Sequence, residues 1–560
     1  MRSIQTGTTL VVRAIGGLHV VTLAWDFAPG QEGKRTGLLG FAIERSELRA
    51  GDVVERYWLR GIKRFEHKDE GVAPGTPLPT SEHPIQSFQW GDYTAKPATA
   101  YRYRVVPVYG KPKNMELADA SATTVEVETE AERGTTHEIY FNRGVAGSQA
   151  YARKFPGMRP DPDQPASEQM KWLSRGLFEA LTGFIRHAAG ADASDYKLRA
   201  MLYEFRYPPV GRAFAAARDA GADVAVRYEA QTYRDENEKM IQDAGIGDIC
   251  QAQRSRDGIR HNKFIVLVHK DKAVAVWTGS TNVSAGGIFG HSNVGHAVWD
   301  EAIARKYLAY WNELSKPAIT RKPLVVSNLA AEPTPARGTA PPTGRSLTLF
   351  SPRDDEQTVA TLEWYGDVVS QAKRVMCMTF AFNLDEIFLH ALAEPGEVLR
   401  YALFDKAIEQ DVEDAVTASG NTTVAAGAKL GDGDLENFLG EKLTGFNRNY
   451  YIHDKFILVD PLGDDPVVVT GSANFSRPSQ TQNDENMLVI RGDTRVADVY
   501  FGEFLRIFDH LYARYVVAKL QRAHRADPGA GYLKEDWAEW VTSNFEPGRK
   551  QLRRQYFLGG

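Results

Sequence analysis

The sequence has few cysteines and almost no excess of either charge. Only two of its 560 residues are cysteine, Cys250 and Cys377, and Cys377 lies in the apolar run of residues 375–380, which predicts a buried strand. Two thiols so placed argue against a disulfide framework or a thiolate metal site. The formal net charge of -5 argues against a protein that coats nucleic acid through bulk positive charge, but it leaves room for a local basic groove.

Targeting and membrane-spanning signals are also missing. The first ten residues lack the basic stretch and apolar core of a secretory signal, and no segment approaches the roughly 18 consecutive apolar residues of a spanning helix. We therefore expect a cytoplasmic protein. Because the chain is too long for a single hydrophobic core, we also expect several domains.

Helical periodicity is nearly absent from the first 130 residues. Alternating runs between Gly, Pro and Asp turns predict strands at residues 20–25, 39–44, 85–90, 101–109 and 123–127. The early Trp25 and the later pair Tyr101 and Tyr103 resemble, in this order, core residues of a fibronectin type III sandwich. We expect an all-β sandwich over residues 1–132 that offers a surface to a protein partner, with an unrelated small sandwich as the alternative.

From about residue 133, helices alternate with apolar strands, which is typical of α/β layers. A Pro/Ala/Thr/Gly-rich linker covers residues 331–345, and the same order of elements returns after it. Residues 347–353 correspond to 139–143, and residues 378–382 correspond to 201–205. We expect two α/β repeats related by a pseudo-twofold axis, at residues 133–330 and 346–525, and a C-terminal helical tail at 526–560.

Each repeat carries a His-x-Lys sequence followed by Gly-Ser-x-Asn, and the glycine lies 18 positions after the histidine in both copies. A lone His-x-Lys carries little information, whereas two copies with identical spacing are highly specific. A polar pair after each copy also matches in order, Ser292-Asn293 and Gln482-Asn483. The candidate site residues are His261, Lys263, Ser280 and Asn282 in the first copy and His453, Lys455, Ser472 and Asn474 in the second.

This pair of motifs resembles the phospholipase D superfamily, whose repeated motif is His-x-Lys-x4-Asp followed by Gly-Ser-x-Asn. The resemblance covers roughly residues 135–520. It implies phosphodiester chemistry at one site built from both copies, with no metal or other cofactor. It also implies that His261 is the nucleophile, forming a phosphohistidine, and that His453 is the general acid and base. With both half-sites on one chain, a monomer can complete the active centre.

The residues support this chemistry directly. Strand side chains alternate, so the histidine and lysine of each copy face the same side. Two imidazoles and two ammonium groups that meet across a pseudo-twofold axis would bind one phosphate. Lysine and asparagine side chains would contact its non-bridging oxygens, supported by the two serines. A histidine pKa near 6.5 makes one imidazole available as a nucleophile and the other as an acid.

The sequence departs from the family motif at two places. The motif aspartate is Asp460 in the second repeat but Val268 in the first. This position lies an odd number of residues after the histidine, so on a strand its side chain faces away from the phosphate. The loss of the aspartate should therefore cost support rather than chemistry. Glu485, which we align with Gly295, gives only the second repeat a carboxylate that could hold a histidine in its productive tautomer. The predicted site is therefore asymmetric.

The motifs do not choose the substrate. We expect a nuclease that binds nucleic acid, and keep a phospholipase D that acts on phospholipid as the alternative, because the apolar loop Gly286–Gly290 could enter a lipid interface. A catalytically inactive phosphate-binding module is the third hypothesis, motivated by Val268 and Gly295. His269, His291 and His296 are interpreted as ordinary core or surface residues. Residues 432–436 predict a turn rather than a calcium loop.

Overall fold

The computed structural model describes residues 1–68, 71–72, 76–144, 148–253, 257–317, 319–355, 357–381, 384–406, 408–427, 452–522 and 532–560. The turn predicted at residues 432–436, and Phe382 of the predicted repeat, lie outside these ranges. Within them, no helix is long and apolar enough to cross a membrane.

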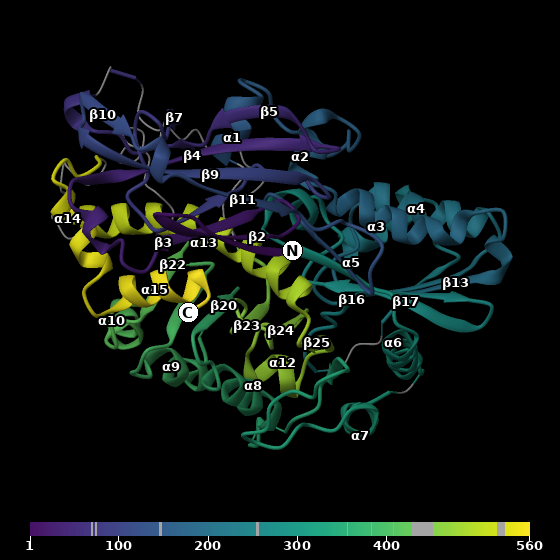
Figure 1. Cartoon of the computed structure of the whole chain (residues 1–560). Coiled ribbons are helices and arrows are strands. Elements are labelled where there is room, and N and C mark those ends of the chain that lie inside the picture. Colours follow the sequence, from purple (N-terminus) through teal and green to yellow (C-terminus); the bar gives the residue numbers. More distant parts are fainter. Residues whose placement is uncertain are drawn as a thin grey trace.

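The N-terminal part of the chain is a sandwich of two antiparallel sheets, as predicted (Figure 1). Trp25, Tyr101 and Tyr103 are fully buried between the sheets, and the more specific likeness to fibronectin type III stays a prediction. A two-stranded ribbon, β6 (Arg60–Gly61) and β7 (Leu78–Pro79), forms a separate ladder. One sheet contains β1 (Arg2–Thr6), β2 (Leu10–Gly16), β3 (Val21–Phe27) and β8 (Gln89–Asp92); the other contains β5 (Asp52–Trp58), β4 (Leu38–Arg49), β9 (Ala100–Lys111), β10 (Asn114–Leu117) and β11 (Thr123–Glu128).

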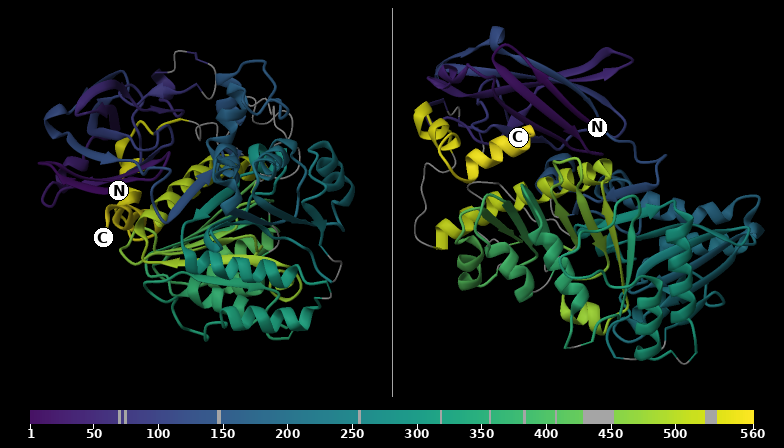
Figure 2. Two further views of the ribbon diagram at one scale, coloured as in Figure 1. Left: turned by 90° about the vertical axis from the view of Figure 1, so that its right-hand side faces the viewer. Right: turned by 60° about the horizontal axis from the view of Figure 1, so that its bottom comes forward.

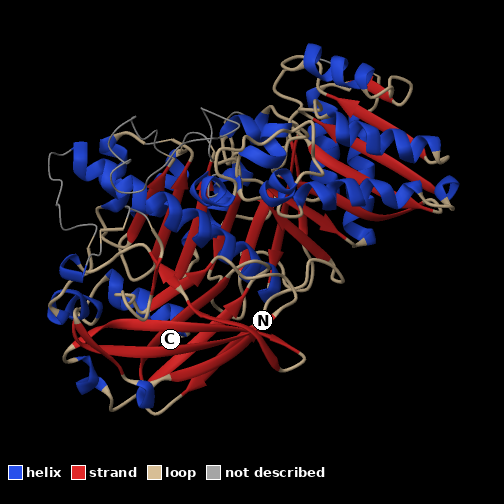
Figure 3. Ribbon diagram, turned by 90° about the horizontal axis from the view of Figure 1, so that it is seen from above, coloured by secondary structure: helices blue, strands red, loops and turns tan. Residues whose placement is uncertain are grey.

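Two seven-stranded sheets of identical topology follow, and their strands run through the middle of the molecule (Figure 3). The first has the spatial order β12 (His137–Phe141), β18 (Val294–Val298), β17 (Lys272–Gly279), β16 (Lys263–His269), β13 (Tyr196–Leu202), β14 (Asp223–Tyr228) and β15 (Cys250–Ala252). The second has the order β19 (Leu347–Ser351), β25 (Glu485–Arg491), β24 (Val467–Gly471), β23 (Phe456–Val459), β20 (Val375–Phe380), β21 (Leu399–Phe404) and β22 (Thr422–Ala426).

The match between the sheets extends to strand direction. In the first sheet β14 runs parallel to its neighbours β13 and β15, and in the second β21 runs parallel to β20 and β22. All other neighbouring strands are antiparallel. The central strands are buried on both faces, which explains why β16 and β20 read as continuous apolar runs rather than alternating ones. The sequence alignment of the repeats was wrong by one residue at β20, because Ala200 pairs with Ile265 whereas Met378 pairs with the corresponding Ile457.

Helices cover both sheets (Figures 1 and 3). The spacing of Leu173, Leu177, Leu181 and Ile185 predicts one helix over residues 170–187, but the structure has two, because Arg175 and Gly176 adopt left-handed backbone conformations that end the first. In the first repeat the helices are α1 (Ser148–Lys154), α2 (Glu168–Ser174), α3 (Leu177–Arg186), α4 (Pro208–Asp219), α5 (Arg234–Asp243), α6 (Glu301–Leu314) and α7 (Arg321–Ala331). In the second they are α8 (Ala360–Ser370), α9 (Glu386–Ala393), α10 (Gln410–Thr417), α12 (Arg477–Thr481) and α13 (Thr494–Arg522), followed by α14 (Trp537–Val541) and α15 (Arg549–Leu558).

The sandwich rests on α13, which separates it from the second sheet (Figures 1 and 2). Ile15 and Leu18 of the sandwich share one apolar core with Phe504 and Phe508 of α13. Arg2 adds an ion pair with Asp498 at 2.8 Å. The sandwich is therefore packed onto the repeats rather than tethered to them.

Residues 532–560 return to the sandwich, so the two ends of the chain pack together (Figure 2). Trp540 of α14 is buried against Phe41 and Phe88, and its Nε1 donates to the Leu38 carbonyl at 3.1 Å. Phe545 contacts Phe88 as well. A segment more than 400 residues away in the chain thus completes the core of the sandwich.

Replacement of Trp540 by alanine should destabilise the sandwich by about 3 to 5 kcal/mol, since it removes a large buried aromatic side chain from a packed core. Urea denaturation followed by circular dichroism measures the decrease in the free energy of unfolding. Trp537 of the same helix is only partly buried, and its replacement by alanine is the matched control with a smaller cost. A loss below about 1 kcal/mol for Trp540→Ala would show that the tail is peripheral.

Candidate functional site

The two His-x-Lys sequences lie immediately before equivalent strands. Lys263 is the first residue of β16, and Lys455 directly precedes β23. The two histidine segments are joined to the opposite repeats by the same hydrogen bond: His261 N donates to the Asp484 carbonyl and His453 N donates to the Ser292 carbonyl, both at 3.1 Å. This reciprocity brings both motifs to one site at the boundary of the repeats.

His261 is held by a carboxylate from the other repeat. Its Nδ1 lies 2.8 Å from Glu485 Oε2, and both side chains are buried. Because a carboxylate oxygen only accepts, Nδ1 carries the proton, and Nε2 of the neutral imidazole keeps its lone pair. The Ser472 hydroxyl donates to the same oxygen at 2.7 Å and accepts from Asn486 N. Burial lowers the pKa of His261 below its usual 6.5, although the adjacent Glu485 opposes this.

His453 has an amide in the equivalent place. Its Nδ1 donates to Asn293 Oδ1 at 3.0 Å and to the Ser280 carbonyl at 3.2 Å, so its Nε2 is likewise the free nitrogen. The Ser280 hydroxyl donates to Asn293 Oδ1 and accepts from Val294 N, as Ser472 does in the other half. Burial, followed by the cations Lys455 and Lys263, holds the pKa of His453 well below its usual range.

The asymmetry predicted for Glu485 is present, but our alignment of that residue with Gly295 was wrong. Gly279 pairs with Gly295 across the first sheet, whereas the equivalent Gly471 pairs with Met487. Glu485 therefore corresponds to Asn293, and the polar pair Ser292-Asn293 corresponds to Asp484-Glu485 rather than to Gln482-Asn483. Each histidine thus has an acceptor from the opposite repeat, one charged and one neutral.

Both motif lysines are buried and folded back on their own histidines. Lys263 Nζ donates to the His261 carbonyl and Lys455 Nζ to the His453 carbonyl, each at 2.6 Å. Burial lowers the pKa of Lys263 to about 7, against the opposing effects of Glu485 and Glu204. Burial and the neighbouring Lys263 hold the pKa of Lys455 well below its usual range. Two buried ammonium groups that repel one another favour an anion between them.

The motif asparagines are placed for ligand contact. Asn282 Nδ2 donates to Glu204 Oε1 at 2.7 Å. The Oδ1 atoms of Asn282 and Asn474 are buried and have no hydrogen-bond partner within the described ranges. Unpaired buried polar atoms are costly in a finished core, and they are typical of a site that is completed by a ligand.

Asp460 lies away from the two histidines, at the far end of β23. Its carboxylate accepts hydrogen bonds from the backbone N–H groups of Lys373, Arg374 and Val375, where β20 begins. Val268 at the equivalent position is buried among apolar side chains. The motif aspartate of this chain therefore supports a strand end; that its loss costs support rather than chemistry stays a prediction.

Sequence reasoning missed three side chains at the site. Tyr203 meets the His261 ring edge-on at 4.8 Å, and Glu204 holds Asn282. His291, interpreted as an ordinary residue, has its ring 5.9 Å from that of His453, and burial lowers its pKa to about 4. The only available signal was position, because Tyr203 and Glu204 directly follow the strand that pairs with β16. His296 lies elsewhere, in a buried chain with His137 and Tyr500.

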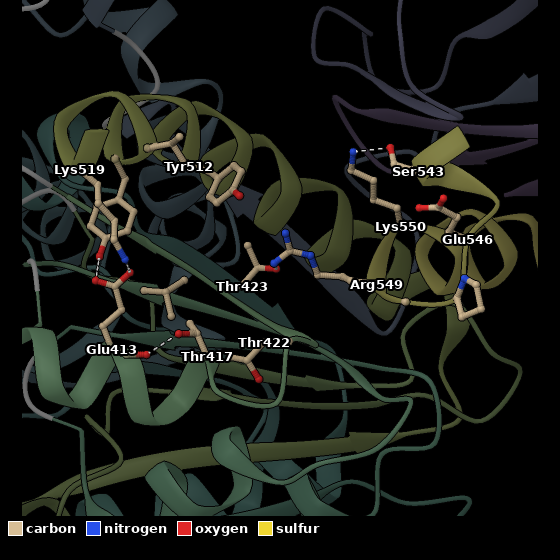
Figure 4. A pocket seen from close by; sticks show the side chains of 16 residues that line it. Glu413, Thr417, Thr422, Thr423, Tyr512, Lys519, Ser543, Glu546, Arg549 and Lys550 are labelled. Carbon is tan, nitrogen blue, oxygen red and sulfur yellow. Dashed lines mark hydrogen bonds and ion pairs between the residues drawn. The ribbon is translucent and has the colours of Figure 1, made fainter. Parts of the chain in front are cut away.

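A cavity of about 540 Å³ lies at the edge of the second sheet, between β22, α13 and α15 (Figure 4). None of the motif residues lines it. Its cations are already engaged, Lys519 by Glu413 and Arg549 by the Thr423 hydroxyl. In the described parts of the chain, no group of three or more His, Cys, Asp or Glu side chains is arranged to hold a metal ion.

Comparison with known proteins bears on the second repeat most directly. Residues 406–508 match the family described as cardiolipin synthase, PLD-like domain. This segment includes His453, Lys455 and Asn474. Over these residues the chain is similar to a phospholipase D-like domain. The resemblance to the phospholipase D superfamily that the motifs predicted is thereby confirmed. The mixed α/β architecture predicted for the chain after the N-terminal sandwich is confirmed as well.

Solved structures resemble parts of the chain at low identity. Phosphatidylserine synthase of Haemophilus influenzae is 13% identical with a TM-score of 0.42, and the match covers 67% of this chain and 97% of that one. Nuc of Salmonella typhimurium is 24% identical with a TM-score of 0.20, over 24% and 84% of the two chains. A mutant of yeast tyrosyl-DNA phosphodiesterase is 10% identical with a TM-score of 0.31, over 54% and 83%. No curated protein matches the chain in sequence.

The buried charges predict a narrow pH optimum. Lys263 must be protonated to bind phosphate, and its pKa of about 7 means that kcat/KM should fall above about pH 7, by about tenfold per pH unit. His261 must be neutral, and its lowered pKa keeps it so until the pH falls below 6.5. Lys263→Arg, which cannot lose its proton, should remove the contribution of Lys263 and leave an alkaline limb set by Lys455, whose pKa is also lowered. A pH–rate profile that stays flat to pH 9 would contradict this assignment.

Proposed function

We propose that this chain is a metal-independent phosphodiesterase that cleaves nucleic acid through a covalent phosphohistidine on His261. The observation that carries the proposal is the unequal pairing of the two histidines. Glu485, a carboxylate, accepts from His261 Nδ1, whereas Asn293, a neutral amide, accepts from His453 Nδ1. Two equivalent imidazoles are thereby given different acid–base properties in one site.

The carboxylate suits a nucleophile. When His261 Nε2 attacks phosphorus, the P–N bond forms, the P–O bond to the leaving group breaks, and the imidazole becomes positively charged. Glu485 stabilises that charge and fixes the tautomer that presents the Nε2 lone pair. Burial alone would raise the pKa of Glu485, but His261, Lys263 and Ser472 outweigh burial and lower it, so the carboxylate stays ionised.

The amide suits a general acid and base. Asn293 adds no charge, so protonated His453 is a strong acid that gives its Nε2 proton to the leaving oxygen. In the second step neutral His453 takes a proton from water, the new P–O bond forms, and the P–N bond to His261 breaks. Lys455 and Lys263 lower the pKa of His453 further. The arriving phosphate offsets their charge and favours the protonated form that the first step needs.

Lysine and asparagine side chains take over the electrostatic work that divalent cations do in two-metal nucleases. Lys263 and Lys455 are placed beside the two histidines, and the amide N–H groups of Asn282 and Asn474 are the donors that would contact the phosphate oxygens. Retention of this complete set argues against a catalytically inactive phosphate-binding module.

Nucleic acid is favoured over phospholipid because the loop that could have entered a lipid interface is not exposed. Ile288 and Phe289 are buried, and Phe289 packs against Phe178 and Tyr207. The segment Gly286–Gly290 is a π-helical turn that completes the core of the first repeat. It therefore offers no apolar surface to a membrane.

The substrate and the metal requirement are tested together. In EDTA, the protein should cleave single-stranded DNA, duplex DNA or RNA and leave phosphatidylcholine vesicles intact. Chelation should have no effect because no step of the proposed cycle uses a metal ion. Gel assays and choline release measure the two activities. Hydrolysis of the vesicles alone would favour a phospholipase D, and activity that chelation abolishes and a divalent ion restores would refute the mechanism.

A further inference from the structure

The first repeat has charged side chains next to its motif where the sequence of the second repeat has apolar ones. Leu202 pairs with Tyr228, and the equivalent Phe380 pairs with Phe404, so Tyr203 corresponds to Ala381. The chain after β13 thus places a phenol ring, the Glu204 carboxylate and, two residues on, a guanidinium on the His261 side of the site, whereas the sequence has Phe382 and Leu384 at the positions that correspond to Glu204 and Arg206. A one-sided addition to a twofold framework points to a substrate with two different ends.

Arg206 is linked to the motif through one carboxylate. Glu204 Oε1 accepts from Asn282 at 2.7 Å, while Glu204 Oε2 accepts from Arg206 Nη2 at 2.7 Å and from its Nε at 3.1 Å. The backbone N–H of Arg206 donates to the Val283 carbonyl at 2.9 Å, next to Asn282 in the chain. The guanidinium therefore lies one side chain away from a group expected to contact the scissile phosphate.

The guanidinium is fixed in orientation but still reaches solvent. It lies over the Tyr233 ring at 4.5 Å. The Arg206 side chain is 35% exposed, whereas Glu204 beneath it is 10% exposed. Its Nη1 donates to no residue that the structure describes. The Nε and Nη2 atoms of the guanidinium bind Glu204, and the Nη1 side remains available to a ligand.

Arg206 also acts on the half of the site that contains His453. Besides burial, which is the main cause, Lys455 and Arg206 both depress the pKa of His291. The His291 ring is 5.9 Å from the His453 ring. Arg206 therefore lies close to the His453 half of the site as well as to Asn282 in the His261 half.

We infer that Arg206 binds the phosphate next to the scissile one, so that the site selects substrates with successive phosphodiesters. The inference rests on the proposed phosphodiesterase function and narrows its substrate to a nucleic acid strand. A guanidinium with a free edge matches the geometry of phosphate oxygens, and contacts of this kind set the register of a strand without reading its sequence. A phospholipid with a single phosphodiester has nothing to offer this subsite.

The test compares a dinucleotide with one phosphodiester, a trinucleotide with two, and bis(4-nitrophenyl) phosphate. The wild type should prefer the trinucleotide over the dinucleotide by about tenfold or more in kcat/KM, the scale of one charge-assisted contact. Arg206→Ala should reduce that ratio to about one. Arg206→Lys, which keeps the charge beside Glu204 but loses the fork, should give an intermediate ratio. Arg212→Ala, an exposed arginine of α4 in the same repeat, should leave the ratio unchanged.

The outcomes separate the subsite from the chemistry. If Arg206→Ala slows all three substrates by the same factor, Arg206 only supports Glu204 and Asn282, and the subsite is refuted. The same holds if the wild type does not distinguish the two nucleotides, or cleaves phosphatidylcholine vesicles but neither nucleotide. Loss of the ratio together with retained hydrolysis of bis(4-nitrophenyl) phosphate supports the subsite. If no phosphodiester of any kind is cleaved, the proposed function itself fails.

Discussion

Replacement of His261 by alanine is expected to lower kcat/KM by about 10⁴-fold or more, for activated and natural phosphodiesters alike. The variant loses the only group that the account assigns as a nucleophile. Neither Lys263 nor Glu485 can replace it, because Lys263 is folded back on the His261 carbonyl and Glu485 serves as the acceptor for His261. Initial rates with bis(4-nitrophenyl) phosphate measure the loss without needing the natural substrate.

The matched control for this variant is His269→Ala. His269 is the last residue of the same strand β16 and stacks on Tyr196 at 4.3 Å, away from the motif. Its removal should leave kcat within about threefold of wild type. A His261→Ala enzyme that still turns over at a few per cent of the wild-type rate would contradict the role of His261.

Replacement of Glu485 by glutamine is expected to lower kcat by about 10² to 10⁴-fold while changing KM little. The closest parallel is the loss of an orienting carboxylate from a catalytic triad, which costs about 10⁴-fold. Glutamine keeps the shape of Glu485 but removes the charge that stabilises the phosphorylated imidazolium of His261. It can also present its amide N–H to Nδ1 and so favour the wrong tautomer.

Asp460→Asn is the control for this second variant. Asp460 is also a carboxylate of the second repeat, but it accepts from three backbone N–H groups at the far end of β23. Its neutralisation should lower the melting temperature and leave kcat unchanged. If Glu485→Gln lost only stability, or if Asn293→Ala cost more in kcat than Glu485→Gln, the assignment of roles to the two histidines would have to be reversed.

The site could be predicted from sequence as far as its repeated spacing extends. The histidines, lysines, serines and asparagines recur at identical intervals, and the structure brings them to one boundary. The same rule would have found the acceptors, since His261 and Asn293 are 32 positions apart and so are His453 and Glu485. We instead matched the polar pair Ser292-Asn293 by residue type to Gln482-Asn483, and similarity of residue type was the weaker guide.

Features that depend on long-range packing could not be predicted in this way. No local pattern places Trp540 in the core of a sandwich built from the first 130 residues, or divides a periodic helix at Arg175, whose guanidinium is buried in an ion pair with Glu503 at 2.6 Å. Likewise, Arg206 becomes notable only once Glu204 is seen to join it to Asn282. Each of these depends on a partner that is distant in sequence or on side-chain placement.

The central claim is that one site, built from both repeats, passes through a covalent bond to His261. It is tested most directly in the His453→Ala variant, with a thymidine 5′-(4-nitrophenyl) phosphate substrate whose leaving group departs without an acid. Acid-free quenching and peptide mass spectrometry should then find a thymidylyl group on the peptide that contains His261, because no base remains to activate water. A nucleotide bound to any other residue, or turnover with no trapped adduct, would contradict the account.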